Sequence, residues 1–169
     1  MKVIYSDHEP KFDNHHSIFL VGPTPRSPAV PSWRPEAIKI LEDLGYKGTV
    51  FIPEWSDHKS QTTYINQVEW EYACLSNCHH IAAWVPRCMD TMPAMTTNVE
   101  FGYWISNRPN NFYYGRPDGA PHTNYLDWLY NKVTNREAVS SLQQLLEDVV
   151  REQFIKAVYK SLTDEGGEQ

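Results

Sequence analysis

The chain has no long apolar segment and few cysteines, and both absences limit what it can be. Its longest uncharged apolar run, Ile81–Val85, is far shorter than the roughly 20 residues that a membrane-spanning helix needs. The polar run Ser6–Glu9 follows the first residues, so the hydrophobic region of a signal peptide is not found there. The cysteines number 3, an odd count that indicates reduced thiols, and we expect a cytoplasmic protein.

Positive charge and glycine-rich phosphate loops are also scarce. Lys and Arg number 15 against 21 Asp and Glu, which gives a formal charge of -6. This balance argues against a nucleic-acid polymer or an anionic membrane as the main partner. The chain has neither a Gly-x-Gly-x-x-Gly run nor a Walker loop, so we expect no cofactor of those classes. Cys74, Cys78 and His79 are not followed by a second close pair of ligands, and we expect no metal.

Aromatic residues, in contrast, are abundant. They make up 13% of the chain, with 6 Trp and 10 Tyr. Flat aromatic walls suit a ligand with a planar ring, whereas the same residues can also fill a core or an oligomer interface. The composition alone leaves both interpretations open.

The alternation of apolar runs with amphipathic stretches predicts an α/β protein. The expected strands are Lys2–Tyr5, Ser17–Val21, Thr49–Ile52, His80–Val85, Asn111–Tyr114 and Ala138–Val139. The expected helices are Ser32–Leu44, Thr62–Asn77, a helix headed by Thr97 and Glu100, Tyr125–Asn131, and Ser141 to about Leu162. This order implies a doubly wound, mostly parallel sheet flanked by helices. Without repeats or linkers, we expect a single domain over residues 1–169 with a frayed tail at 162–169.

Helical periodicity assigns a buried face to two of these helices. The expected core stripe of the second helix is Ile65, Val68, Tyr72 and Leu75. The expected core stripe of the last helix is Leu142, Leu145, Leu146 and Val149. Ser32 is the expected N-cap of the first helix.

A carboxylate near the end of a strand is the main candidate for chemistry. Ligands of such sheets bind beyond the carboxyl ends of the strands, and Glu100 follows the loop after the fourth apolar run. In the first turn of a helix, the positive helix end favours its ionised form, which can act as a nucleophile. The alternative is a Thr-x-x-Glu capping box, in which Glu100 bonds back to the Thr97 backbone N–H.

Four short motifs occur in the order seen in one protein family. They are Ile18–Pro23, Phe51–Glu54, Trp84–Arg87 and Thr97–Gly102. Over about residues 17–130 the chain resembles nucleoside 2-deoxyribosyltransferase-like proteins. The resemblance implies a flavodoxin-like core and cleavage of the N-glycosidic bond of a 2'-deoxynucleoside or its monophosphate, with transfer of the sugar to another base or to water. It also implies a small-molecule nucleoside or nucleotide as partner and a homo-oligomer, since family members often complete their sites with a neighbouring subunit.

The resemblance also assigns roles to particular positions. Glu100 matches the family's nucleophile, and Gly22, Pro23 and Thr24 lie in the loop that contacts the substrate. Thr97 and Asn98 match the turn that helps bind a 5'-phosphate in nucleotide-cleaving relatives. Two positions depart from the family pattern. Phe19 stands where many members have a tyrosine, and Cys78–His80 stands where many have an aspartate.

Further candidates come from residue chemistry alone. Glu54, Asp90 and Asp118 are candidates to protonate or bind the leaving base, although Glu54 can also be a solvated loop charge and Asp118 a turn residue. Arg87, at a strand end, can meet a phosphate or carboxylate or be an ordinary exposed arginine. Trp33, Trp55 and Trp84 are candidates to stack on the base, although Trp84 lies within a strand and can belong to the core instead.

Two other functions remain open from the sequence. The same pocket can serve a non-catalytic protein that senses a nucleotide or an ADP-ribose-like ligand, which the departures at Phe19 and Cys78–His80 favour. The chain can also be an oligomerisation domain with a vestigial pocket.

Overall fold

The computed structural model describes residues 1–13, 15–56 and 64–151. One sheet has the strand order β1-β3-β2-β4-β5, and all neighbouring strands are parallel. The strands are β1 (Lys2–Tyr5), β2 (Ser17–Val21), β3 (Thr49–Ile52), β4 (His80–Trp84) and β5 (Phe112–Gly115). The helices are α1 (Arg34–Asp43), α2 (Tyr64–Asn77), α3 (Met95–Asn107), the 3-10 turn η1 (Pro109–Asn111), α4 (Asn124–Thr134), and a helix over residues 142–151. The predicted α/β, doubly wound, flavodoxin-like fold is confirmed.

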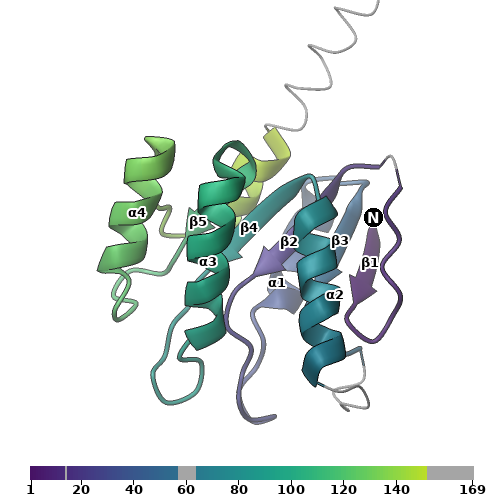
Figure 1. The fold of residues 1–169 in the computed structure, drawn as a ribbon, viewed down its shortest axis with the longest axis horizontal. Helices are drawn as coiled ribbons and strands as arrows, with labels where there is room; N and C mark the ends of the chain where they lie inside the picture. Colours follow the sequence, from purple (N-terminus) through teal and green to yellow (C-terminus); the bar gives the residue numbers. More distant parts are fainter. Residues whose placement is uncertain (14, 57–63, 152–169) are drawn as a thin grey trace, which may run out of the picture.

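Helices cover both faces of the sheet (Figure 1). On one face α2, α3 and α4 pack through residues such as Trp70, Phe101 and Leu126, and on the other α1 and the helix over 142–151 pack through Leu41 and Leu145. Strands β2 and β4 are buried along their whole length, which explains their continuous apolar sequences. None of the helices in the described ranges is long and apolar enough to cross a bilayer.

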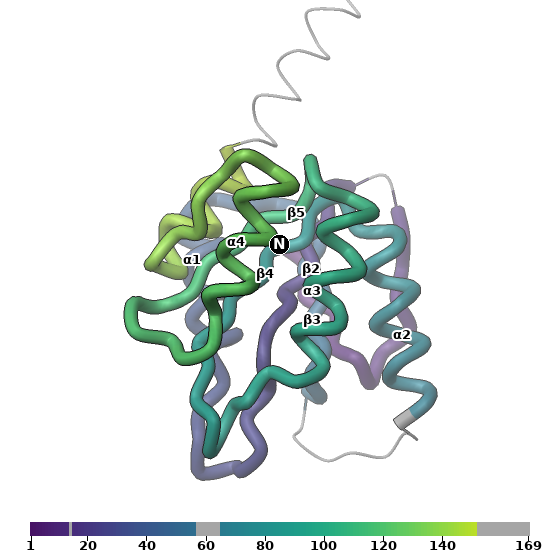
Figure 2. The backbone as a smooth tube through the Cα atoms, turned by 60° about the vertical axis from the view of Figure 1, so that its left-hand side comes forward, coloured from purple at the N-terminus to yellow at the C-terminus, as the bar shows by residue number. Residues whose placement is uncertain are grey.

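The order of the strands fixes where a ligand site can form. From β2 the chain goes to β3 on one side and then crosses to β4 on the other side of β2. The loops that leave β2, β3 and β4 therefore diverge at the carboxyl ends of these strands, which is where ligands bind in open α/β sheets. The loops after β2 and β4 lie side by side, joined by a 3.1 Å hydrogen bond from the Arg26 N–H to the Thr91 carbonyl (Figure 2).

Some of the predicted details are wrong. In α2, Ile65 is 58% and Tyr72 is 55% exposed, so the predicted stripe faces away from the sheet except at Leu75. The helix is apolar on two sides, and Trp70 and Cys74 occupy the buried one. The predicted start at Thr62 lies outside the described residues. In the last helix the predicted core positions, from Leu142 to Val149, are all buried, whereas its predicted end and the tail at 162–169 lie outside the described residues.

Two predictions about short elements are also corrected. Ala138–Val139 is not a strand, because only Val139 pairs with β5, through an isolated bridge to Gly115. Ser32 does not occupy the N-cap of α1, which is Trp33. The Ser32 hydroxyl instead accepts a hydrogen bond from the Arg34 N–H and turns toward Glu54.

Gly22 allows the loop after β2 to pass closely beside β4. Its φ is +156°, a backbone conformation that residues with side chains rarely adopt. A Cβ atom at this position would overlap the Trp84 carbonyl oxygen and lie 2.7 Å from Cζ2 of Trp33. Because β4 and the Trp33 side chain are both buried, neither can move away at low cost.

We therefore predict that Gly22→Ala lowers the free energy of unfolding by about 2–4 kcal/mol. Gly119→Ala is the matched control, since Gly119 also has a positive φ, +76°, but no atom of another described residue, apart from its chain neighbours, lies within 4 Å of the position that its Cβ would take. We expect the control to lose only about 1 kcal/mol. Urea unfolding followed by circular dichroism measures both. Equal stability of the two variants would show that the close approach of Gly22 to β4 does not exclude a side chain at this position.

Candidate active site

A cleft of about 230 Å³ opens at the carboxyl ends of β2 and β3, between α2 and α3. Its walls come from the loop after β2, the end of β3, α2, and the start of α3. The lining residues are Gly22, Pro23, Thr24, Arg26, Pro53, Gln67, Val68, Glu71, Pro93, Ala94, Met95, Thr96, Thr97 and Glu100. The predicted residues Gly22, Pro23, Thr24, Thr97 and Glu100 are thus brought together.

Helix α3 begins earlier than the sequence suggests. Ala94, with a left-handed φ of 60°, is its N-cap, and the Ala94 carbonyl accepts the first helical hydrogen bond, from the Asn98 N–H at 3.1 Å. A two-way backbone pairing of Cys88 with Met92 turns the chain just before this point. The predicted capping box with Thr97 as N-cap is therefore wrong. Glu100 lies in the second turn of α3, where its side chain reaches the cleft.

The Glu100 carboxyl faces a second carboxyl, that of Glu71 on α2. Burial, together with the negative charge of Glu71 and a hydrogen bond to it, raises the pKa of Glu100 to about 8. Burial likewise raises the pKa of Glu71. Two carboxylates in contact cannot both ionise at low cost, so the pair holds one proton near neutral pH. We predicted that the positive helix end favours the ionised form of Glu100, but burial and the neighbouring Glu71 outweigh that effect.

Neighbouring groups fix Glu71 and its ionisation. The Gln67 side-chain amide donates to Oε1 of Glu71 at 2.9 Å and to the Pro53 carbonyl at 3.4 Å. This bond to the charged form lowers the pKa of Glu71 against the effect of burial. Arg34 lowers the pKa of both carboxyls through its positive charge. The proton of the pair is therefore favoured on Glu100 in the free protein, with Glu71 as the hydrogen-bond acceptor.

Arg34 lies behind the loop that forms one wall of the cleft. Its side chain is 1% exposed and donates to Oε1 of Glu54 at 2.6 Å. It also donates to the Gly22 carbonyl at 2.7 Å and to Oγ1 of Thr24 at 3.2 Å, so one guanidinium holds the loop after β2 in place. Glu54 is held further by the Ser32 hydroxyl at 2.8 Å. Both bonds engage the Glu54 carboxylate, and Glu54 is not among the described residues that line the cleft.

The other predicted contact residues lie away from the cleft. Arg87 and Asn98 bond to each other on the side of α3 that faces α4. Asp118 is exposed in its turn, and Asp90 is exposed as well. Trp55 is half-buried and is not among the described residues that line the cleft. Among the residues that the structure describes, no group of three or more His, Cys, Asp or Glu side chains is placed to hold a metal ion.

Three residues of the site, Glu71, Gln67 and Arg34, were not predicted from the sequence. A Gln and a Glu four residues apart on a helix are common, so this spacing alone marks no site. Arg34 follows Ser32 and Trp33 at the start of α1, where its long side chain can reach back under β2, but no local pattern predicts that. The residues of the site come from several different elements, and only the tertiary fold brings them together.

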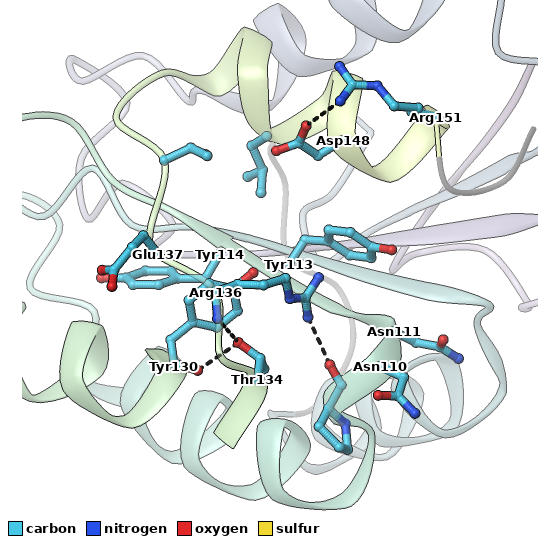
Figure 3. Close-up of a pocket in the computed structure, with 13 residues that line it drawn as sticks. Asn110, Asn111, Tyr113, Tyr114, Tyr130, Thr134, Arg136, Glu137, Asp148 and Arg151 are labelled. Atoms are coloured by element: carbon cyan, nitrogen blue, oxygen red, sulfur yellow. Dashed lines mark hydrogen bonds and ion pairs between the residues drawn. The ribbon is translucent and has the colours of Figure 1, made fainter. Parts of the chain in front are cut away.

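A larger cavity, of about 780 Å³, lies beside the edge strand β5 (Figure 3). It is bounded by the segment that enters β5, by the end of α4, and by Asp148 and Arg151. Arg136 lies between the rings of Tyr113 and Tyr130, with its carbon Cζ 4.7 and 5.2 Å from their centres. The same guanidinium donates to the Pro109 and Phe112 carbonyls at 2.9 and 2.6 Å. These contacts join α4 to β5, so we regard this cavity as secondary to the cleft with the two carboxyls.

The raised pKa of Glu100 makes stability depend on pH. A carboxyl whose pKa is higher in the folded state binds more protons there, so stability falls as the pH rises from its unfolded pKa of about 4.5 through 8. We predict that Glu100→Gln, which removes this titration, is as stable as wild type near pH 4.5 and more stable by on the order of 3 kcal/mol near pH 8. Urea unfolding at several pH values measures the difference. Glu36→Gln, at an exposed position of α1, is the control, and its stability should match that of wild type at every pH. If the stabilities of Glu100→Gln and wild type changed in parallel with pH, the raised pKa of Glu100 would be contradicted.

Comparison with known families supports the motif resemblance. A model of the family described as nucleoside 2-deoxyribosyltransferase like matches residues 15–116, which is more than half of the chain. The matched segment contains β2, β3 and β4, both loops of the cleft, and both of its carboxyls. A comparison with curated proteins found no match. The chain belongs to the nucleoside 2-deoxyribosyltransferase-like family.

Proposed function

We propose that the protein cleaves the N-glycosidic bond of a 2'-deoxynucleoside or of a deoxynucleoside monophosphate, and that Glu100 is the nucleophile. The observation that carries the proposal is the pair of Glu100 and Glu71, half-buried side by side in a cleft at the carboxyl ends of the strands. Family membership supports a small nucleoside as substrate. Perturbed carboxyls in such a cleft are typical of acid–base sites.

The pair can supply both functions that this reaction needs. If the shared proton moves to Glu71, Glu100 becomes a carboxylate. Glu100 then attacks C1' of the sugar as the bond from C1' to the base nitrogen breaks, and the proton of Glu71 passes to the leaving base. The product of this step is a glycosyl ester of Glu100 and a neutral base. A second base, or water, attacks C1' and returns a proton to Glu71 as the ester bond breaks.

Glu71 replaces the general acids considered from the sequence. Glu54 is engaged by Arg34 and Ser32, while Asp90 and Asp118 are exposed outside the cleft. Glu71 alone among these carboxyls lines the cleft with Glu100. Its hydrogen bond from Gln67 orients it, as a catalytic acid requires. The proposal therefore assigns the acid role to a residue of α2.

We predict that Glu100→Gln lowers base exchange between a deoxynucleoside and a free base by at least about a thousandfold, because the amide cannot form the ester. Chromatography of the nucleosides measures the exchange. Glu69→Gln, on an exposed position of α2, is the matched control and should retain activity. Exchange that survives in Glu100→Gln would exclude Glu100 as the nucleophile, and tight binding of a deoxynucleotide by wild type without turnover would favour a sensor.

Glu71 can be tested through the leaving group. The base of 7-methyl-2'-deoxyguanosine already carries a positive charge and leaves without being protonated. We predict that Glu71→Gln slows the cleavage of 2'-deoxyguanosine by about a hundredfold or more and spares that of the methylated substrate. The ratio of the two rates measures the effect. An equal loss for both substrates would contradict a role for Glu71 as general acid.

We also propose that the protein is a homo-oligomer. Helices α2 and α3 expose large apolar side chains beside the cleft, which include Ile65, Tyr72, Met95, Val99 and Tyr103. Val99 is 73% exposed and Tyr103 is 48% exposed on the outer face of α3. Apolar surface gathered in this way is typical of an interaction face.

We predict that the double variant Val99→Glu, Tyr103→Glu lowers the mass of the particle in solution, because charge would have to be buried at the interface. Size-exclusion chromatography with light scattering measures this mass. Glu42→Lys, at an exposed position of α1 on the opposite layer, is the control and should not change it. A monomeric wild-type protein would contradict the proposal.

A further inference from the structure

A second hollow lies on the other side of α3, between α3 and α4. It has a volume of about 240 Å³ and is lined by Asn98, Gly102, His122, Tyr125, Leu126 and Leu129. None of these residues lines the cleft that contains Glu100. One end of this α3–α4 groove is polar, with Asn98 and His122, and the rest is apolar. The groove therefore has the character of a separate binding site.

A buried arginine lies behind the polar end of the groove. Arg87, which follows β4, is 7% exposed. Its Nη1 donates to the His122 carbonyl at 2.5 Å, and its Nη2 donates to Oδ1 of Asn98. A guanidinium carries five N–H groups, and these bonds use only two. The Nε–H is buried without a hydrogen-bond partner within the described ranges.

The charge of Arg87 also lacks a counter-charge. Arg34 is paired with Glu54 at 2.6 Å, and Arg116 is paired with Asp127 at 2.8 Å. No carboxylate of the described chain forms such a pair with Arg87. Burying a cation without a partner is costly, and an anion bound beside it offsets that cost. Arg87 is not among the described residues that line the groove, but the two residues that it bonds, Asn98 and His122, are, so an anion that enters this end of the groove lies next to the guanidinium.

The apolar part of the groove suits a flat group. Among the described residues, none outside the backbone of α3 itself has an atom within 4 Å of the Cβ that a side chain at Gly102 would have, so this part of α3 is open. Tyr125 on α4 is 69% exposed and presents its ring at the groove. A planar apolar body can lie against Gly102 beside this ring.

We propose that the α3–α4 groove binds a small organic anion, with its phosphate or carboxylate at the end held by Arg87 and a flat apolar body beside Gly102 and Tyr125. This site is distinct from the glycosidic chemistry proposed above and does not depend on it. Asn98 belongs to the first turn of α3, two residues before Glu100, so the occupant would contact the helix that carries the nucleophile without entering its cleft.

Isothermal titration of the full chain with phenyl phosphate, inorganic phosphate and phenol tests the proposal. We expect phenyl phosphate to bind more tightly than either fragment, because it fills both ends of the groove. Gly102→Leu should weaken its binding at least about tenfold, since the new side chain occupies the groove, and leucine at a helical position is compatible with folding. Benzoate in place of phenyl phosphate distinguishes a carboxylate site from a phosphate site, and tight binding of either one supports the proposal.

Variants on both sides of α3 locate the bound anion. Arg87→Met should weaken the binding of phenyl phosphate at least about tenfold, and Glu100→Gln should leave it unchanged. If circular dichroism shows that Arg87→Met is unfolded, Gly102→Leu decides. Unchanged binding in Gly102→Leu, or loss of binding in Glu100→Gln, would overturn the proposal, and the latter would place the anion in the Glu100 cleft.

Discussion

The buried guanidinium of Arg34 is the interaction on which the site depends most. It lies beneath the end of β2, neutralised by Glu54, and its other N–H groups donate to the Leu20 carbonyl of β2 and to the Gly22 carbonyl of the loop that follows. Removing one member of a buried pair costs about 3–5 kcal/mol, because the partner is left charged and unpaired. The cleft wall therefore has a fixed shape before any ligand arrives. The same positive charge reaches Glu71 and Glu100 and limits how far burial can raise their pKa.

The fold could be predicted from the sequence because its main signals are local. Strands β2 and β4 are continuously apolar, and the turns and helices between them have ordinary stop signals, so the parallel doubly wound sheet follows from their alternation. The errors occurred where two local signals competed. Helix α2 is apolar on two sides, and periodicity alone cannot tell which side the sheet will cover. The Thr-x-x-Glu pattern at Thr97 resembles a capping box, but the helix already begins at the upstream turn, with Ala94 as its N-cap.

The site was predicted less completely than the fold. Glu100, Thr97 and the loop from Gly22 to Thr24 do share one cleft, because β2 and β4 are neighbours in the sheet and the segments that follow them meet at its carboxyl edge. Glu71 could not be found in this way. It belongs to the site only because the fold places α2 beside α3 and brings the two carboxyls together. Arg87 and Asn98 were expected beside the substrate, but they lie across α3 from the cleft. Asn98 points away from Thr97 and Glu100 because neighbouring positions of a helix point in different directions, and Arg87, in the loop before α3, bonds to it there.

The contact between Glu71 and Glu100 links the protonation of the site to the relative position of two helices. Its two members are attached to different helices, so the strength of their contact depends on the spacing of α2 and α3. A movement that separates the two acids removes the part of the raised pKa of Glu100 that comes from the charge of Glu71, whereas the larger part, which comes from burial, remains. Any shift of α2 against α3 therefore changes how strongly the pair holds its proton, and protons are exchanged with the solvent as the helices move.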